Sequence, residues 1–335
     1  MTRPLRTAVV GVGHLGRVHA KILSENPLSE LVCVVDLDEG RARSVGAEFG
    51  CRAVGDANDL PEDLDAATIV VPTSAHARVA VPLLERGVPC LVEKPLASSL
   101  AEADRLLAAA EKGGVCLAVG HVERFQPGVK KLRQLGMEPR FIECHRLSQF
   151  SFRALDVGVV HDLMIHDLDL VLDFVPSEVE RLDAVGGVVF TNSVDLASVR
   201  IVFRNGVRAN VTASRVSLAP MRRFRMFSSQ GYVSLDFTAN AGTLVRKGSA
   251  FDQGIRDLRA LPLSDRVPQA GFPGGGLLDV VQLELADGER PLQAELDSFL
   301  RSVSEGRAPE VTGLDGRRAL ELADRIVAEI RAQAW

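Results

Sequence analysis

Cysteine is scarce in this chain and forms no recognisable framework. The 335 residues contain five cysteines, an odd number, at positions 33, 51, 90, 116 and 144. Disulfide frameworks and zinc sites use closely and regularly spaced cysteines, a pattern that is missing here. Most of the five lie in apolar runs such as VCVV and GVCLAVG. We therefore expect buried thiols, no metal site, and a protein of the reducing cytoplasm.

Long apolar runs and a basic excess are also missing. No apolar stretch reaches the roughly 20 residues that a membrane-spanning helix needs. The N-terminal segment MTRPLRTAVVGVG runs into a glycine-rich turn before a signal-peptide core can form. Acidic residues outnumber basic ones, which gives a net charge of −5 at pH 7. These absences argue against a membrane protein and against a general nucleic-acid partner.

The composition that remains is that of a globular protein, with 46% hydrophobic and 25% charged residues. A chain of this length exceeds what one core usually supports, so we expect two domains. In the first 120 residues, short apolar runs alternate with helical patterns, which is typical of a doubly wound parallel sheet. The expected strands are Thr7–Val10, Leu31–Val35, Arg52–Val54, Ala67–Val71, Pro89–Val92 and Val115–Val119. A helix after Gly13 should bury one stripe, formed by Leu15, Val18, Ile22 and Leu23.

The pattern changes after His121. Several strands follow without long crossovers, which indicates a largely antiparallel open sheet in an α+β domain. The expected strands are Phe141–Leu147, Ser198–Phe203, Gly206–Val216, Arg223–Ser229 and Gly231–Phe237. One strong helix is expected over Val157–Phe174, and two closing helices over Leu292–Val303 and Leu314–Ile330. The expected division is 1–121, 122–290 and 291–335.

A glycine-rich motif joins the first strand to the first helix, the context in which G-x-G-x-x-G is informative. It reads Gly11-Val12-Gly13-His14-Leu15-Gly16, and its loop and helix N-terminus suit a pyrophosphate. Asp36 follows the second strand, where a carboxylate can accept hydrogen bonds from the adenosine ribose. We expect residues 1–121 to be a Rossmann domain that binds NAD. A glycine turn with an unrelated Asp is the alternative, and Arg41 and Arg43 leave NADP open.

Two further strand ends carry polar residues at the same rim. Pro72, Thr73 and His76 follow the fourth strand and are expected to contact the cofactor, although a plain strand-to-helix turn capped by Ser74 is an alternative. Glu93-Lys94-Pro95 ends the fifth strand. A half-buried Lys94 can hydrogen-bond a substrate hydroxyl and stabilise a developing alkoxide. A solvated surface lysine is the alternative.

The helix of the second half carries Asp162 and His166 four residues apart, so their side chains are neighbours. This pair suits a general base, because the carboxylate can orient the imidazole and stabilise its charge. An ordinary surface ion pair is the alternative. His161 and Asp169 do not complete a metal site, because the helical angle places His161 away from Asp162.

Together these motifs resemble the Gfo/Idh/MocA family of nicotinamide-dependent sugar oxidoreductases over essentially the whole chain. The resemblance implies that Lys94, Asp162 and His166 are the catalytic set and that Glu93 and Lys94 also contact the cofactor. It implies further that the C-terminal helices return to the Rossmann domain. Members of the family are commonly dimers or tetramers joined through the open sheet of the second domain, and a homo-oligomer is expected here.

A narrower similarity lies in GHVERF, FIECHRL, DLMIHDLDLVL and TASRVS, which begin at residues 120, 141, 162 and 212. These segments resemble the UDP-N-acetylglucosamine 3-dehydrogenase branch. The branch makes a 3-keto sugar that a partner aminotransferase converts to the 3-amino sugar of lipid A. A diphosphate substrate needs positive charge, and the candidates by position and resemblance are Arg124, Arg146, Arg215 and Arg222. For each of these arginines, a surface salt bridge is the alternative. A dehydrogenase of a free sugar or inositol and a non-catalytic dinucleotide sensor are the alternatives.

The sequence departs from the family pattern at two places. Val157 stands where the family often has the first of two glycines before the catalytic aspartate, and Gln126 stands where the branch usually has asparagine. The first departure bears on how the chain enters the helix, and the second on a substrate or cofactor contact. Neither removes a candidate catalytic group.

Overall fold

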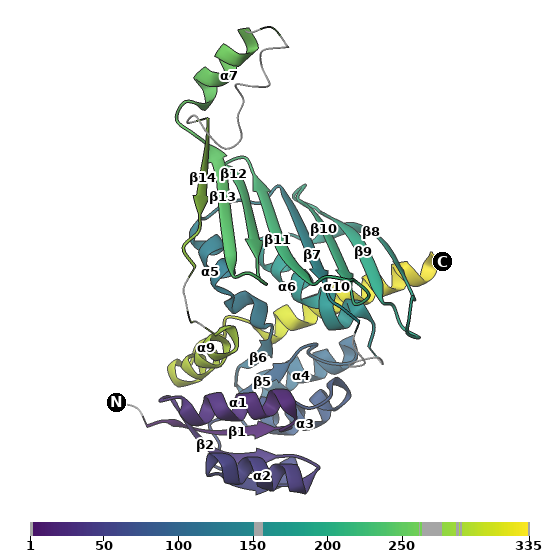
Figure 1. Cartoon of the computed structure of the whole chain (residues 1–335). Coiled ribbons are helices and arrows are strands. Elements are labelled where there is room, and N and C mark those ends of the chain that lie inside the picture. The colour runs from purple at the N-terminus through teal and green to yellow at the C-terminus, as the bar shows by residue number, and fades with distance from the viewer. Residues whose placement is uncertain are drawn as a thin grey trace. The chain divides into compact units, whose positions relative to one another are not determined.

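The computed structural model describes residues 3–150, 157–260, 262, 277–285, 288 and 290–333. Figure 1 shows the course of the chain through its helices and strands. The chain divides into two compact units, one of residues 1–125 with 289–325 and one of residues 126–288 with 326–335. Of the C-terminal segment, residues 289–325 thus group with the first unit and residues 326–335 with the second. Among the described residues, no helix is long and apolar enough to cross a membrane.

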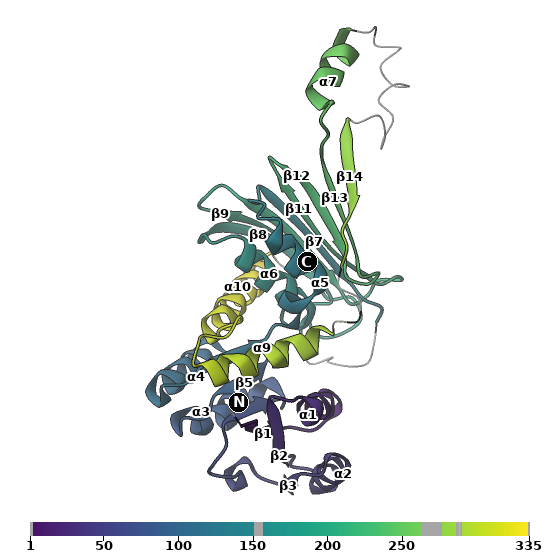
Figure 2. The same ribbon diagram turned by 90° about the vertical axis from the view of Figure 1, so that its left-hand side faces the viewer.

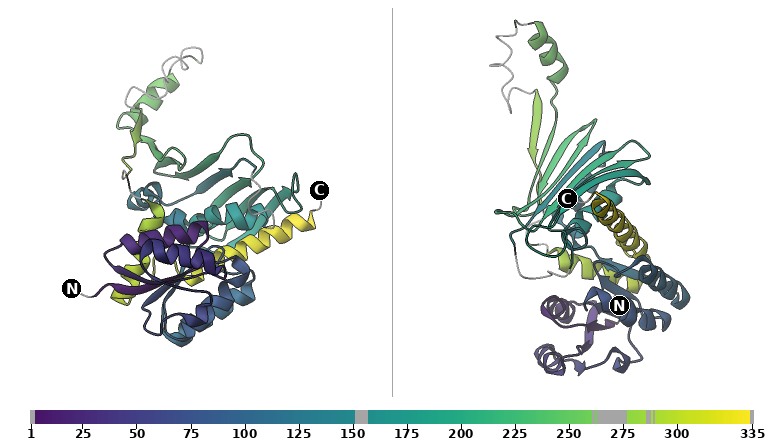
Figure 3. Two further views of the ribbon diagram at one scale, coloured as in Figure 1. Left: turned by 60° about the horizontal axis from the view of Figure 1, so that its bottom comes forward. Right: turned by 90° about the vertical axis from the view of Figure 1, so that its right-hand side faces the viewer.

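The first unit contains a six-stranded parallel sheet in the order β3-β2-β1-β4-β5-β6. This order confirms the doubly wound fold class expected from the sequence. The strands are β1 Leu5–Val10, β2 Ser29–Val35, β3 Arg52–Val54, β4 Ala66–Ile69, β5 Cys90–Glu93 and β6 Leu117–Gly120. Helices α1 (His14–Glu25) and α2 (Glu39–Phe49) cover one face, and α3 (His76–Glu85) and α4 (Leu100–Gly113) cover the other (Figures 2 and 3). The strand order reverses between β1 and β4, and ligands bind at such switch points.

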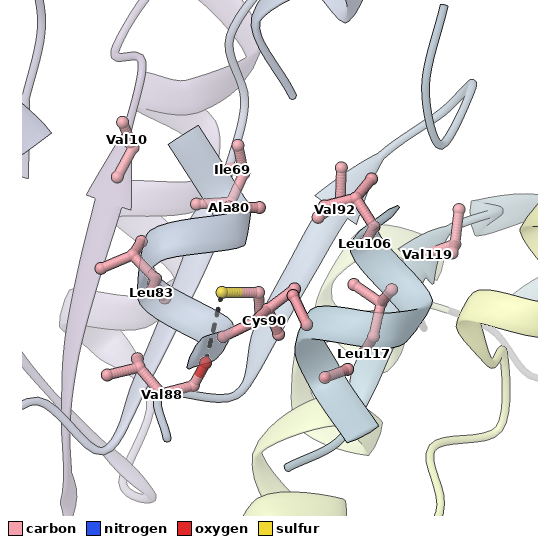
Figure 4. Packing of buried hydrophobic residues seen from close by; sticks show 14 of the residues in the cluster. Val10, Ile69, Ala80, Leu83, Val88, Cys90, Val92, Leu106, Leu117 and Val119 are labelled. Carbon is pink, nitrogen blue, oxygen red and sulfur yellow. Dashed lines mark hydrogen bonds between the residues drawn. The ribbon is translucent and has the colours of Figure 1, made fainter. Parts of the chain in front are cut away.

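The strands of this unit are apolar on both faces because helices cover both faces. Figure 4 shows Leu83 of α3 and Leu106 of α4 among the buried side chains of β4, β5 and β6. The thiol of Cys90 lies in this cluster, fully buried, and donates to the carbonyl of Val88 at 3.4 Å. Burial raises the pKa of the Cys90 thiol far above its ordinary value. All five cysteines are free.

The expected stripe of α1 was wrong in part. Leu23 is buried, but Leu15 and Val18 are 41% and 37% exposed. The buried face instead consists of Gly16, His19, Ala20 and Leu23. Small residues let the helix approach the glycine turn closely, so the larger apolar side chains point outward. Two closing helices, α9 (Pro291–Glu305) and α10 (Gly313–Ala332), extend slightly beyond the expected bounds, and α9 contacts α1.

The second unit contains an eight-stranded sheet in the order β14-β13-β12-β11-β7-β10-β9-β8. It is largely antiparallel, as expected, except that β10 pairs with β7 in parallel. The strands are β7 Phe141–Leu147, β8 Val179–Gly187, β9 Leu196–Phe203, β10 Arg208–Ser214, β11 Met221–Ser228, β12 Gly231–Asp236, β13 Ala241–Lys247 and β14 Leu278–Gln282. The sequence reading omitted β8, β13 and β14. It also did not foresee the parallel pair, which arises because a helix and two strands intervene between β7 and β10.

One face of this sheet is covered by α6 (Ile165–Phe174), which contacts β7 and β10. The covered face of β7 carries the buried Ile142, Cys144 and Arg146. The single helix expected over Val157–Phe174 differs at its start, because residues Val160–Met164 form a π-helical turn before α6. Two helices of this unit were not expected, α5 (Pro127–Gln134) and α7 (Phe251–Ala260). The expected loop at 270–276 lies outside the described residues.

Candidate dinucleotide site and catalytic residues

The glycine loop between β1 and α1 has the geometry of a phosphate cradle. Gly11 has a φ of +88°, and a Cβ there would lie 2.4 Å from the carbonyl oxygen of Val70. A Cβ at Gly16 would lie 1.8 Å from the carbonyl oxygen of Gly11, whereas one at Gly13 would meet nothing within 4 Å. The exposed His14 and Leu15 begin α1, whose N-cap, Gly13, makes no side-chain capping bond. The first N–H groups of α1 therefore face open space and can bind an anion.

Asp36 lies one residue beyond β2 and its carboxylate is turned toward this loop. The Val12 N–H donates to Asp36 Oδ2 at 3.0 Å. A cavity of about 890 Å³ adjoins the loop, with a lining that includes Gly11, Gly13, Asp36 and Pro72. Cofactor pockets have volumes of roughly 300–1,000 Å³. The glycine cradle, the carboxylate and the cavity size fit an adenine dinucleotide.

The residues after β4 divide between cavity and core. Pro72 is exposed and lines the cavity, and Thr73 is half-buried in a 3₁₀ turn, Thr73–Ala75. Ser74 caps no helix, contrary to the alternative considered above, because the N-cap of α3 is Ala75. His76 contacts backbone carbonyls inside the unit and not the cavity. The side chain is 1% exposed and has no place in the cavity lining.

His76 instead connects two loops. Its Nε2 lies 3.0 Å from the carbonyl oxygen of Val71, and its Nδ1 lies 3.0 Å from that of Pro95. Burial lowers the pKa of His76, although its backbone contacts oppose this effect. The imidazole thus ties the end of β4 to the loop that carries Lys94.

Glu93 is the last residue of β5 and Lys94 follows it, and a buried histidine lies beside them. His19 of α1 is fully buried, and its Nε2 lies 3.2 Å from Glu93 Oε1. The Lys94 N–H donates to Glu93 Oε2 at 3.2 Å. Burial raises the pKa of Glu93, but the neighbouring His19 and the charge of Lys94 outweigh burial and lower it overall. Sequence reasoning missed His19, because nothing in the local pattern distinguishes it from a surface histidine. Lys94 is half-buried beside this pair.

Asp162 and His166 lie in the second unit, on the π-helical turn and the first turn of α6. Both side chains are half-buried. The Asp162 N–H donates to the carbonyl of Gly158 at 3.1 Å. Local π-helical turns are frequent at functional sites. Of the other carboxylates of α6, Asp169 is fully buried, and Asp173 pairs with Arg133 at 2.8 Å. No metal-binding cluster occurs among the residues that the structure describes.

Three of the four candidate arginines have acidic partners and are nearly buried. Arg146 forms a two-pronged pair with Asp167 at 2.8 and 2.9 Å, inside the second unit. Arg215 lies 3.6 Å from Asp195 and also donates to the carbonyl of Val157. In the first unit, Arg124 lies 3.6 Å from Asp315.

Arg222 of β11 differs from these three, because its side chain is exposed. Within the described part of the chain it has no acidic partner within 4 Å. Sequence reasoning treated the four arginines alike, because partners such as Asp167, Asp195 and Asp315 are distant or undistinguished in sequence.

The Rossmann unit, with its glycine cradle and cavity, defines an NAD-binding oxidoreductase, and comparisons with known proteins agree. The family model described as "Oxidoreductase family, NAD-binding Rossmann fold" matches residues 5–121, and the GFO/IDH/MocA C-terminal domain model matches residues 101–234. The chain belongs to the GFO/IDH/MocA oxidoreductase family.

Among its relatives, UDP-N-acetylglucosamine 3-dehydrogenase of Acidithiobacillus ferrooxidans is 37% identical over 98% of both chains. Myo-inositol 2-dehydrogenase of Thermotoga maritima is 26% identical over 95% of this chain and 94% of its own length. A solved structure of the Acidithiobacillus ferrooxidans enzyme superposes with a TM-score of 0.88 at 36% identity and covers 99% of both chains. The chain therefore has the fold and the family of NAD-dependent dehydrogenases that act on sugar hydroxyls.

Proposed function

We propose that this protein oxidises the C3 hydroxyl of UDP-N-acetylglucosamine to the 3-keto sugar. The observation that carries the proposal is the full-length similarity to a UDP-N-acetylglucosamine 3-dehydrogenase, at 37% identity over 98% of both chains. NAD, when bound, supplies the hydride acceptor. Its pyrophosphate would lie against Gly13 and the start of α1, and its adenosine ribose against Asp36. His14, Leu15, Pro72, Thr73 and Glu93 remain proposed cofactor contacts, whereas we assign His76 a supporting role.

The proposed proton chemistry belongs to three side chains. His166 takes the proton of the C3 hydroxyl, which requires a neutral imidazole. Asp162 orients that imidazole and stabilises its charge after the transfer. The ammonium of Lys94 stabilises the negative charge that develops on the hydroxyl oxygen. Lys94 directly follows β5, Asp162 lies on the π-helical turn, and His166 lies in the first turn of α6.

The substrate diphosphate is proposed to interact with Arg222. An anion gains most from a cation that no carboxylate already neutralises, and Arg222 is exposed without an acidic partner within 4 Å in the described chain. We propose that Arg124, Arg146 and Arg215 stabilise the structure and do not bind the diphosphate. Their buried charges are already compensated by carboxylates. Removing one partner of such a buried pair costs several kcal/mol, roughly 3–5.

The uncovered face of the eight-stranded sheet is the proposed contact between copies of the chain. A hollow of about 340 Å³ on this face is lined by residues that include Glu143, His145, Arg200 and Asn210. These side chains carry both signs of charge, which suits a self-complementary interface. We propose a dimer or tetramer. Light scattering after size-exclusion chromatography should give a mass above 36.1 kDa, and a monomer would contradict this.

The proposed setting follows from the chemistry of the substrate. Nucleotide sugars and NAD belong to the cytoplasm, and the five free thiols suit that reducing compartment. A 3-keto nucleotide sugar is the substrate that an aminotransferase needs, so we propose an aminotransferase as the pathway partner and lipid A as the destination.

Titration calorimetry with UDP separates the proposal from the alternative substrate class. The similarity to myo-inositol 2-dehydrogenase, 26% over 95% of the chain, keeps a free sugar or inositol as the second candidate. An enzyme for a nucleotide sugar should bind UDP in the presence of NADH, whereas an enzyme for a free polyol should not. Both relatives named above are dehydrogenases, which argues against a non-catalytic sensor.

The base is tested with two histidines of the same segment. His166→Ala should reduce kcat by at least about a hundredfold, the usual contribution of a general base, with the affinity for NADH unchanged. His161→Ala is the matched control, since it removes a half-buried imidazole from the π-helical turn one residue before Asp162. Equal losses in the two variants would refute His166 as the base.

A further inference from the structure

Asp36, the carboxylate at the ribose end of the cavity, is already engaged by the backbone. The Val12 N–H donates to Oδ2 and the Asp38 N–H donates to Oδ1, both at 3.0 Å. The side chain is only 10% exposed. A carboxylate offers about four acceptor positions, so two remain for further donors. These are the positions that two ribose hydroxyls would need.

Arg41, in the first turn of α2, holds the remaining positions. Its Nη1 lies 3.2 Å from both oxygens of Asp36, and its Nη2 lies 3.4 Å from Asp38 Oδ2. The Arg41 side chain is 48% exposed. Water can solvate a guanidinium this exposed, so it can be displaced from the carboxylate, while the two backbone donors are held by the loop.

We propose that Arg41 is a second specificity-determining residue for the cofactor, acting against Asp36. When ribose hydroxyls take the free positions of Asp36, Arg41 leaves the carboxylate but remains in the cavity wall. There it faces the ribose 2′ position and offers a cation to a 2′-phosphate, which Asp36 repels. Asp36 therefore sets the preference for NAD, and Arg41 gives the site a residual affinity for NADP and NADPH.

The neighbouring arginines do not share these contacts. Arg43 is 70% exposed, pairs with Glu39 at 2.9 Å and does not line the cavity. Arg78 of α3 does line the cavity, but no described contact joins it to Asp36 or Asp38. Both serve as matched controls for the removal of a positive charge near the site.

The test is the dissociation constant of NADH and of NADPH, measured by titration calorimetry on the full chain. Wild-type protein should bind NADPH measurably but more weakly than NADH. Arg41→Ala should weaken NADPH binding by about tenfold, the value of one charge-assisted hydrogen bond, and change NADH binding by less than about threefold. Arg43→Ala and Arg78→Ala should leave the ratio of the two constants unchanged.

A double variant tests the coupling directly. Asp36→Asn keeps an acceptor for the backbone but removes the charge, and it should tighten NADPH binding by about tenfold. Adding Arg41→Ala should abolish that gain. The proposal is overturned if wild type binds no NADPH at millimolar concentration, if Arg78→Ala instead of Arg41→Ala changes the ratio, or if the gain survives in the double variant. Melting curves by circular dichroism verify that each variant is folded.

Discussion

Gly13 and Gly16 differ in what a methyl group would meet, and this difference predicts two distinct phenotypes. A Cβ at position 16 would lie 1.8 Å from the Gly11 carbonyl oxygen, a backbone atom, and contacts below 3.0 Å essentially never occur. The helix start must therefore move by more than 1 Å, since 3.0 minus 1.8 is 1.2 Å. Overpacking against a backbone atom costs about 3 kcal/mol.

Gly13→Ala should leave the free protein nearly unchanged. A Cβ there meets nothing within 4 Å, and the φ of −63° is allowed for alanine. The cost is below about 1 kcal/mol, because alanine caps a helix less well than glycine. The methyl group would instead occupy the space that the pyrophosphate needs, so NADH affinity should fall by at least about tenfold.

The assay combines fluorescence titration of NADH with thermal unfolding followed by circular dichroism. Gly13→Ala should unfold within a few degrees of the wild-type temperature but bind NADH poorly, whereas Gly16→Ala should lose both stability and binding. Wild-type affinity in Gly13→Ala would refute the placement of the pyrophosphate. Equal stability of the two variants would refute the geometric argument for Gly16.

Three further outcomes are expected. A Cβ at Gly120 would lie 3.0 Å from three carboxyl atoms of Glu93, the residue before Lys94. Gly120→Ala should therefore displace Glu93 and lower kcat by about tenfold at unchanged NADH affinity. An unchanged kcat would contradict this. Burial alone would raise the pKa of Asp195, but hydrogen bonds from Phe190, Thr191 and Val189 outweigh burial and lower the pKa from 3.8 to about 2. This lowered pKa contributes about 2 kcal/mol to the free energy of unfolding, which is present above pH 3.8 and is lost as the pH falls toward 2. Asp195→Asn should abolish that part of the pH dependence of unfolding. Arg222→Ala should weaken UDP binding, whereas Arg223→Ala, which removes the partner of Asp236 at 3.5 Å, should not; equal effects would count against Arg222.

The parallel sheet was predictable because its strands are buried on both faces. The second half of β1, Ala8–Val10, is apolar and buried, and β5 is apolar up to Glu93 at its end. The glycine loop and Asp36 were also predictable, because their roles depend on residues that are close to them in sequence. The bounds of β3 and β7 coincide with the expected ones.

The features that the sequence did not predict depend on contacts between residues that lie far apart in the chain. The face of α1 could not be chosen locally, because Leu15 and Val18 fit a helical stripe as well as Gly16 and Ala20 do. The charges that surround an arginine are not a local property either, since nothing in the sequence near Arg146 or Arg215 indicates the buried Asp167 and Asp195 with which they pair. β13 has a mixed polar composition and gives little periodic signal.

The most direct measurement is the absorbance at 340 nm when purified protein, NAD and UDP-N-acetylglucosamine are combined, with myo-inositol as the parallel substrate. A 3-aminotransferase and glutamate are added to remove the keto product. The account predicts NADH formation with the nucleotide sugar, none with the polyol, and a product oxidised at C3. No absorbance rise with the nucleotide sugar, or a rise with myo-inositol alone, would contradict it.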